Sequence, residues 1–191
     1  MNATLFQRIS WLAGRALGSL PAAALLKIAL PLRPVVRDVD PVRDLDALAL
    51  FGAALRPALR PRLRAAWEQA LRDAAPDFRR VLVAADARRP DRLAGFLHLQ
   101  KGRPDWWIAG MEVRPLYRRR GLAELMAREA IRRLKAEGAR TICLSVRAGN
   151  ASAIRLYEKL GFRPAEGLSD PTLHPGDVGM RLILQPGAAT G

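Results

Sequence analysis

Apolar positions recur along the chain with two periods, and the change of period separates helices from strands. From Leu5 to Leu20 the apolar residues fall on one helical face, and Pro21 is expected to end or kink this helix. A second apolar stretch occupies residues 22–32 between prolines. Residues 33–37 then predict a short strand.

Two helices and a three-stranded meander are predicted next. Asp40 and Pro41 indicate a helix start, because a capping acceptor is followed by proline in the first turn. A second helical stripe runs from about Pro61 to Pro76. Apolar runs of strand length then occupy residues 81–85, 93–100 and 106–113, and the polar turns between them predict antiparallel pairing.

The C-terminal third alternates helix, strand, helix and strand. A helix with its apolar face from Ala123 to Leu134 is expected to end at Gly138. Residues 141–146 resemble a buried strand, and residues 153–160 form a short helical stripe that Gly161 ends. The last strand is predicted over residues 178–184. This pattern divides the chain into an extension (1–31), one domain (32–186) and a frayed tail (187–191).

Composition limits the kinds of site that the chain can hold. One cysteine, Cys143, excludes an internal disulfide and a cysteine-only metal site, and two histidines, His98 and His174, exclude a multi-histidine centre. The net charge of +14, from 32 basic and 18 acidic residues, indicates an anionic partner such as a nucleotide cofactor, a nucleic acid or a lipid surface. No RNA-binding aromatic motif is visible, so nucleic acid is the least favoured of the three.

The N-terminal extension has no acidic residue, since the first one is Asp38. Its basic amphipathic stripe, with Trp11 near the boundary, is typical of a helix on an anionic membrane surface. An organelle transit peptide shares this composition, and a helix packed on its own domain or on a partner chain is the third interpretation. Its apolar stretches are too short to span a bilayer.

A glycine-containing basic turn joins the last strand of the meander to the following helix. It consists of Arg118, Arg119, Arg120, Gly121, Leu122 and Ala123. Free N–H groups at a helix N-terminus attract anions, Gly121 lets the backbone approach closely, and the small Ala123 leaves room for a phosphate. A solvated basic turn is the alternative.

A second motif follows one strand later, from Asn150 to Phe162, and includes Leu156, Tyr157, Glu158, Lys159, Leu160 and Gly161. Together the two motifs resemble the GNAT superfamily of N-acetyltransferases, over residues 32–185. The resemblance implies an α/β (α+β) fold with a central mixed, mostly antiparallel sheet of six to seven strands flanked by helices. It also implies an enzyme that transfers acetyl from acetyl-CoA to an amine, with no metal.

The resemblance assigns roles to individual residues. Acetyl-CoA would be bound by the basic turn (Arg118, Arg119, Arg120, Gly121, Leu122, Ala123), by the strand residues Met111 and Val113, and by Asn150. Asn150 could equally be a helix N-cap. Tyr157 matches the general acid that protonates the departing thiolate, whereas its alternative role is that of a core aromatic.

The resemblance does not identify the residue that acts as the general base. Residues 144–150 resemble the bacterial ribosomal-protein N-terminal acetyltransferases, in which a glutamate base precedes the Val-Arg pair, but this chain has Ser145 there. A hydroxyl cannot replace a carboxylate base near neutral pH, although it can hold a water. Glu112 is the candidate on the predicted strand, where regular alternation would turn it away from the face of Val113 unless a bulge intervenes. His174 has a suitable pKa but is more simply a loop histidine, and Cys143 is most simply a buried strand residue.

The acceptor is expected to be a peptide or protein amine, with a small polyamine or aminoglycoside as the alternative. A polycation would prefer an acidic cleft, which this basic chain does not favour. The expected location is the cytoplasm, at the periphery of a membrane if residues 1–31 bind lipid or a membrane partner. A competing hypothesis is an accessory protein that keeps the fold but has lost turnover, for which Ser145 and the extension are the support.

Overall fold

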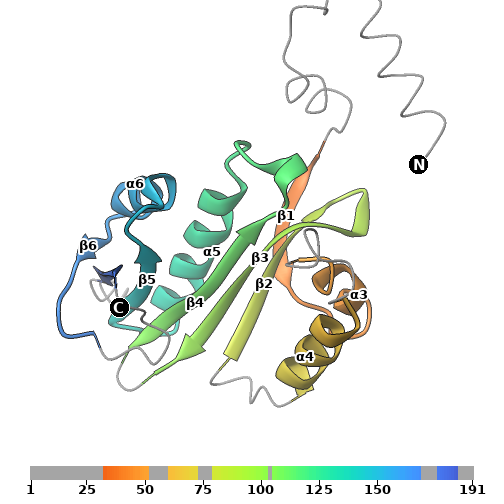
Figure 1. Cartoon of the computed structure of the whole chain (residues 1–191), viewed down its shortest axis with the longest axis horizontal. Helices are drawn as coiled ribbons and strands as arrows, with labels where there is room; N and C mark the ends of the chain where they lie inside the picture. The colour runs from red at the N-terminus through yellow and green to blue at the C-terminus, as the bar shows by residue number, and fades with distance from the viewer. Residues whose placement is uncertain (1–31, 52–59, 73–78, 103–104, 169–175, 185–191) are drawn as a thin grey trace, which may run out of the picture.

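Seven strands form one sheet in the order β1-β2-β3-β4-β5-β7-β6 (Figure 1). The computed structural model describes residues 32–51, 60–72, 79–102, 105–168 and 176–184, so the predictions for the extension, for His174 and for the tail lie outside the described residues. Among the described pairs of neighbouring strands, β4 and β5 alone run parallel. The predicted mixed, mostly antiparallel sheet is therefore confirmed. The strands are β1 Pro34–Asp38, β2 Arg79–Asp86, β3 Arg89–Lys101, β4 Trp106–Val113, β5 Thr141–Arg147, β6 Arg163–Pro164 and β7 Asp177–Ile183.

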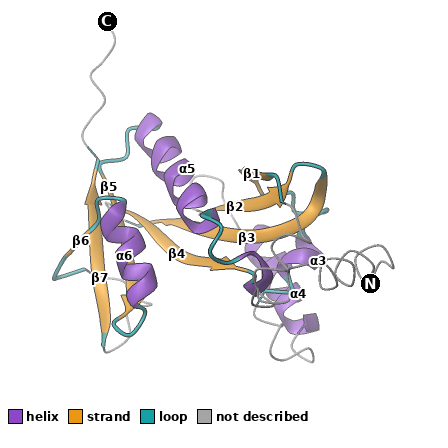
Figure 2. Cartoon of the chain, turned by 90° about the horizontal axis from the view of Figure 1, so that it is seen from above, coloured by secondary structure: helices purple, strands orange, loops and turns teal. Residues whose placement is uncertain are grey.

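Helices cover both faces of the sheet. Figure 2 shows α5 (Leu122–Ala136) above strands β1 to β4, with α3 (Leu45–Leu48) and α4 (Arg60–Arg72) below them. The helix α6 (Ala151–Lys159) follows β5, and the short 3-10 helix η3 (Pro115–Tyr117) leads from β4 to α5. The apolar stripe of α5 is buried against the sheet, as its period predicted.

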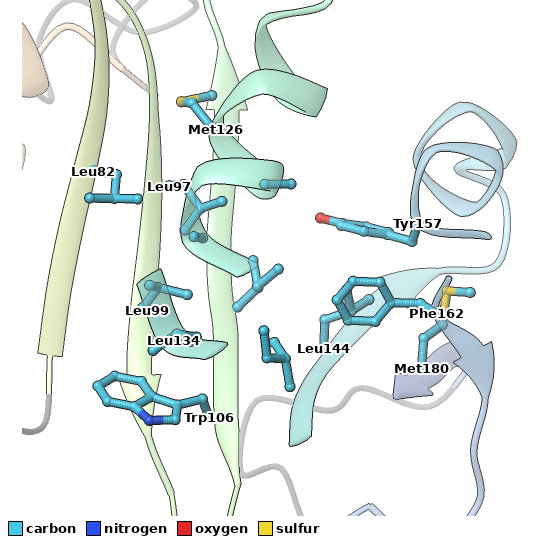
Figure 3. Packing of buried hydrophobic residues seen from close by; sticks show 14 of the residues in the cluster. Leu82, Leu97, Leu99, Trp106, Met126, Leu134, Leu144, Tyr157, Phe162 and Met180 are labelled. Carbon is cyan, nitrogen blue, oxygen red and sulfur yellow. The ribbon is translucent and has the colours of Figure 1, made fainter. Parts of the chain in front are cut away.

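Two apolar layers result from this arrangement. The larger layer lies between the sheet and α5 and α6, and includes Leu97, Met126, Leu144, Tyr157 and Phe162 (Figure 3). The second layer lies on the opposite face against α3 and α4, and there Phe96 makes edge-to-face contacts with Phe51 and Trp67, both at 5.1 Å between ring centroids. The sheet thus has two distinct faces, and each strand residue belongs to one of them.

Two details differ from the sequence predictions. The helix expected after Pro41 begins at Leu45, because the Asp40 carboxylate accepts hydrogen bonds from the N–H groups of Val42 and Arg43 and closes a turn instead. The strand β6 was not predicted, since two residues are too few to show an alternating pattern. The glycine stops are confirmed: Gly138 and Gly161 follow α5 and α6 with φ of 77° and 95°.

Candidate active site

The strand β4 loses its partner on one side halfway along its length. Its parallel pairing with β5 covers Trp106–Ile108 against Ile142–Leu144 and does not continue. On the other side β4 stays paired with β3, and the Arg114 N–H donates to the Ala94 carbonyl at 2.9 Å. Because backbone groups alternate in direction along a strand, the N–H and C=O groups of Met111 and Val113 point away from β3. They form a strand edge with no strand partner among the described residues.

A bulge in β4 decides which face each side chain takes. The register passes from His98–Gly110 to Leu99–Ile108, so Ala109 is the extra residue. Beyond it the alternation is regular, and Met111 and Val113 pack toward α5. Glu112 stands opposite Phe96 and shares its face, the one that α3 and α4 cover.

Glu112 is half-buried, and no hydrogen bond or ion pair joins its carboxylate to another described residue. Ser145 of β5 is also half-buried and belongs to the same face, because its neighbours Leu144 and Val146 point to the α5 layer. Both side chains therefore lie on the face opposite Val113, as alternation predicted for Glu112.

The basic turn ends in a helix N-terminus that no side chain caps. Gly121 is the N-cap of α5 with a φ of 74°, and no side chain caps the helix. The first hydrogen bond of the helix runs from the Leu125 N–H to the Gly121 carbonyl at 2.9 Å, which leaves the N–H groups of Leu122, Ala123 and Glu124 without an intrahelical acceptor. A Cβ built on Gly121 would meet no atom within 4 Å. This open set of donors at the positive end of a helix fits a phosphate group.

The three arginines of the turn have different surroundings. The Arg118 Nε donates to the Val113 carbonyl at 3.0 Å, which joins the turn to the end of β4. The Arg120 guanidinium lies over the Tyr117 ring, 5.5 Å from its centroid. Arg119 is exposed, with a φ of 61°.

Tyr117 and Arg92 support the turn, and the sequence reasoning did not identify them. Tyr117 is buried beside Ala94 and Leu122, and the Arg92 Nε donates to its hydroxyl at 2.6 Å. The two residues are 25 positions apart, so no local pattern could have paired them. The contact positions the segment that directly precedes Arg118.

Tyr157 projects from α6 into the α5 layer. The residue is 6% exposed, and its ring contacts that of Phe162 at 5.5 Å between ring centroids. Burial raises the pKa of its hydroxyl to about 12, so the proton is retained at neutral pH. Figure 3 shows the hydroxyl pointing from α6 toward α5, and no described residue hydrogen-bonds to it. The group is a protonated donor without a partner, which suits a general acid.

The remaining candidates have structural roles. The Asn150 Oδ1 accepts from the Ala153 N–H at 3.3 Å, so its N-cap interpretation is confirmed, while a contact with acetyl-CoA remains a prediction. Cys143 is buried with its Sγ 3.7 Å from Asp105 Oδ2, and burial raises the pKa of its thiol. A raised pKa is the opposite of what a nucleophilic thiolate needs.

The described part of the chain holds no cluster of three histidine, cysteine or acidic side chains that could bind a metal ion. Among the described helices, none has the length and apolar character needed to cross a bilayer.

The chain is similar in sequence to known acetyltransferases. The model of the acetyltransferase (GNAT) family matches residues 45–162. The [Ribosomal protein bS18]-alanine N-acetyltransferase of Salmonella typhimurium is 40% identical over 75 residues, which cover 39% of this chain and 51% of that protein. The mycothiol acetyltransferase of Corynebacterium glutamicum is 35% identical over 79 residues, covering 40% of this chain and 26% of that protein. The chain thus spans about half the length of the first relative and a quarter of the second.

Solved structures show the same fold. The ribosomal-protein-S18-alanine N-acetyltransferase of Escherichia coli has a TM-score of 0.60 at 21% identity, covering 83% of this chain and 98% of that chain. Arabidopsis thaliana NAA60, solved in complex with acetyl-CoA, has a TM-score of 0.60 at 18% identity, covering 80% and 99%. At these identities the likeness is one of fold. The family match extends over most of the described domain and includes both motifs, and the chain belongs to the acetyltransferase (GNAT) family, whose enzymes use acetyl-CoA as co-substrate.

Proposed function

We propose that this chain is an N-acetyltransferase that acetylates a peptide or protein amine. The observation that carries the proposal is the unpaired edge of β4 at Met111 and Val113, which the fold combines with an α5 N-terminus that no side chain caps and with the protonated hydroxyl of Tyr157. Acetyl-CoA supplies the acyl group: the amine nitrogen bonds to the carbonyl carbon, and the carbon–sulfur bond breaks.

The chain's own groups divide the binding between them. The N–H groups of Leu122, Ala123 and Glu124 would hold the pyrophosphate, together with the charge of the three arginines. The free N–H and C=O groups of Met111 would pair with the amides of the pantetheine arm, in the manner of an added strand. Asn150 would contribute through its remaining amide N–H groups, since its Oδ1 caps α6.

One backbone donor and one side-chain donor would take part in the acetyl transfer. The N–H of Val113 would stabilise the negative charge that develops on the carbonyl oxygen. Tyr157 would then give its proton to the departing sulfur, since its hydroxyl is protonated and has no competing partner among the described residues.

Glu112 is proposed as the base that takes the amine proton. Its carboxylate is half-buried, has no ionic partner among the described residues and belongs to the face of the sheet opposite Tyr157. A base and an acid on opposite faces match a reaction in which the amine arrives from one side of the sheet and the sulfur leaves on the other. The Ser145 hydroxyl, on the face of Glu112, would hold a water rather than accept the proton.

A protein or peptide acceptor is favoured over a polyamine. A relative at 40% identity over 75 residues is named for acetylating an alanine of a ribosomal protein. The net charge of +14 disfavours a polycationic acceptor by simple repulsion.

An acceptor screen with detection of the released thiol tests the proposal. The panel contains peptides with different N-terminal residues, the same peptides with a blocked α-amine, spermidine and an aminoglycoside. Turnover with a free peptide amine that disappears when the amine is blocked would support the proposal. Binding of acetyl-CoA without turnover on any acceptor would favour the accessory-protein hypothesis.

A docking role is proposed for residues 1–31. The segment has no acidic residue and has an apolar stripe along one predicted helical face. It joins the domain at Leu32, which packs on the cluster of Tyr117 and Leu122 beneath the basic turn. Such docking on an anionic membrane would keep the enzyme at the membrane periphery in the cytoplasm.

A further inference from the structure

A cavity of about 570 Å³ lies at the edge of the sheet where β1 ends. His98 of β3 and the C-terminal end of α5 form part of its wall. The apolar part of the wall comes from α4 and β2 and includes Trp67, Ala70, Leu71 and Val81. Pockets that hold ligands have volumes of about 300–1,000 Å³, so the cavity is large enough to receive a substrate group. The described residues that line it include none of those assigned above to acetyl-CoA or to the acetyl transfer.

The charged side chains of the cavity wall are paired with one another. Arg133 Nη1 donates to both carboxylate oxygens of Asp38, at 2.9 and 2.8 Å, and Arg80 forms an ion pair with Glu137. These four side chains together carry no net charge. A charged group that entered the cavity would lose its hydration without gaining an unpaired counter-charge, whereas an apolar group gains free energy from burial. The cavity therefore favours an apolar group.

The cavity and the proposed base Glu112 belong to the same face of the sheet. The pairing of β2, β3 and β4 places Val83, Phe96 and Glu112 in one row across the strands, and the adjacent row consists of Val81, His98 and Gly110. Residues two positions apart on a strand share a face, and diagonal neighbours on adjacent strands are about 7–8 Å apart. His98, in the cavity wall, is such a diagonal neighbour of Glu112.

Gly110 leaves space between the cavity and Glu112. A Cβ built on Gly110 would meet one atom within 4 Å, the Phe96 Cε2 at 3.9 Å. In the row that contains Val81 and His98, the strand β4 thus contributes no side chain. An extended chain covers about 3.3–3.6 Å per residue, so the step from Glu112 to His98 corresponds to about two residues.

We infer that the cavity receives an apolar side chain of the acceptor peptide, carried by its first or second residue, an inference that rests on the proposed function. With the α-amine at Glu112, the start of the peptide would lie across Gly110, and the side chain would be buried beside Trp67, Leu71 and Val81. The Trp67 ring is held in place by its edge-to-face contact with Phe96, at 5.1 Å between centroids. The cavity would thus select acceptors by the size and polarity of one side chain near the amine.

Steady-state kinetics of the full chain with a panel of peptides tests the inference. The peptides have a free α-amine and differ only in carrying alanine, leucine, phenylalanine or glutamate at the first or at the second position. At one of the two positions, kcat/KM is expected to be about tenfold or more higher for leucine or phenylalanine than for alanine, because an apolar side chain is buried. Glutamate should give no such gain.

Ala70→Phe places a ring in the cavity and should remove the preference for leucine and phenylalanine. The kcat/KM for the alanine peptides and the Kd for acetyl-CoA should stay close to those of the wild type. Ala66→Phe is the matched control, because it adds the same ring to α4 at an exposed position outside the cavity wall. Gly110→Val is the second variant: its Cβ has room, and its branched side chain would stand between the cavity and Glu112, so it should also remove the preference.

The outcomes separate this inference from the proposed function. Equal kcat/KM for alanine, leucine and phenylalanine peptides in the wild type would overturn the inference and leave the proposed function intact. A preference that persists in folded Ala70→Phe, or that Ala66→Phe removes equally, would also overturn it. If Ala70→Phe does not fold, the persistence of the preference in Gly110→Val has the same meaning. Absence of turnover with every peptide amine would overturn the proposed function itself.

Discussion

At the scale of single residues, the proposed site depends on the hydroxyl of Tyr157 and on the glycine at position 121. Tyr157 offers a proton inside an apolar layer, and burial keeps its pKa near 12. Gly121 has no side chain, so a phosphate group can approach the backbone at the start of α5 closely. A change at Tyr157 is expected to lower the catalytic rate, and a change at Gly121 is expected to weaken CoA binding. The two effects can therefore be measured separately.

Replacing Tyr157 by phenylalanine is expected to lower kcat by about 10²–10⁴-fold, because the proton donor is lost while the ring keeps its contact with Phe162. The Kd for CoA and the Tm should stay close to those of the wild type. Tyr117→Phe is the comparison variant: it loses the hydrogen bond from Arg92 and should act on CoA affinity rather than on kcat. A folded Tyr157→Phe protein with wild-type kcat would leave Tyr157 as a core aromatic.

Gly121→Val is expected to weaken CoA binding at least tenfold in calorimetry and to lower the free energy of unfolding by about 1–2 kcal/mol. The binding loss follows because the added side chain occupies the open space above the helix N-terminus. Gly138→Val is a control for backbone strain, since Gly138 has a φ of 77° and equally open surroundings but follows the other end of α5. If both variants lose similar stability but only Gly121→Val binds CoA more weakly, the phosphate site at the start of α5 is supported. If both variants bind CoA as the wild type does, that phosphate site is contradicted.

At the scale of elements, β1 is fastened to the start of α3 by a buried carboxylate. The Asp44 side chain is fully buried and takes two hydrogen bonds from Arg37, at 2.6 and 2.8 Å, and a third from the Asp40 N–H at 2.8 Å. Burial alone would raise the pKa of this carboxyl, but the hydrogen bonds and the charge of Arg37 outweigh it and hold the pKa below its ordinary value of 3.8.

Asp44→Asn should lower the free energy of unfolding at pH 7 by about 2–3 kcal/mol, because it leaves a half-buried guanidinium without its counter-charge. A carboxylate with a lowered native pKa stabilises the fold fully above its unfolded pKa and loses this contribution as the pH falls through the native value. The difference between variant and wild type in urea unfolding should therefore shrink below about pH 3.8. Asp46→Asn, at an exposed pair with Arg64, is expected to cost less than about 1 kcal/mol; a larger loss there than at Asp44 would contradict this account.

At the scale of the whole molecule, we propose that the domain folds without its N-terminal extension. The described residues of the two large apolar layers, all beyond position 31, already cover both faces of the sheet. Deleting residues 1–31 should therefore leave Tm and CoA affinity unchanged.

The same deletion should abolish co-sedimentation with vesicles that contain anionic phospholipid, if the extension docks as proposed. In the full chain, Leu12→Glu places a charge on the predicted apolar stripe and should weaken co-sedimentation without changing turnover. Co-sedimentation with neutral vesicles measures how much of the binding does not depend on the anionic charge of the lipid. Retention of the full-length chain in the supernatant with anionic vesicles, as a monomer, would refute docking and favour packing on its own domain.

Much of the fold and both motifs could be read from the sequence, because they depend on neighbours within a few positions. The apolar stripe of α5, the glycine stops at Gly138 and Gly161, and the N-cap at Asn150 each follow from local backbone chemistry. The basic turn before α5 and the motif of α6 likewise occupy consecutive residues, so the expected family and its co-substrate followed from their order.

The tertiary structure alone decided how these local pieces meet. The bulge at Ala109 arises from pairing with β3, and it decides which of the two faces of the sheet Val113 takes and which Glu112 takes. The end of β4–β5 pairing at Ile108 leaves the strand edge at which we propose that the pantetheine arm binds, and Arg92 reaches Tyr117 from 25 positions away. Each of these features depends on contacts between segments that are distant along the chain. Local periodicity and short motifs do not predict the free energy of such contacts.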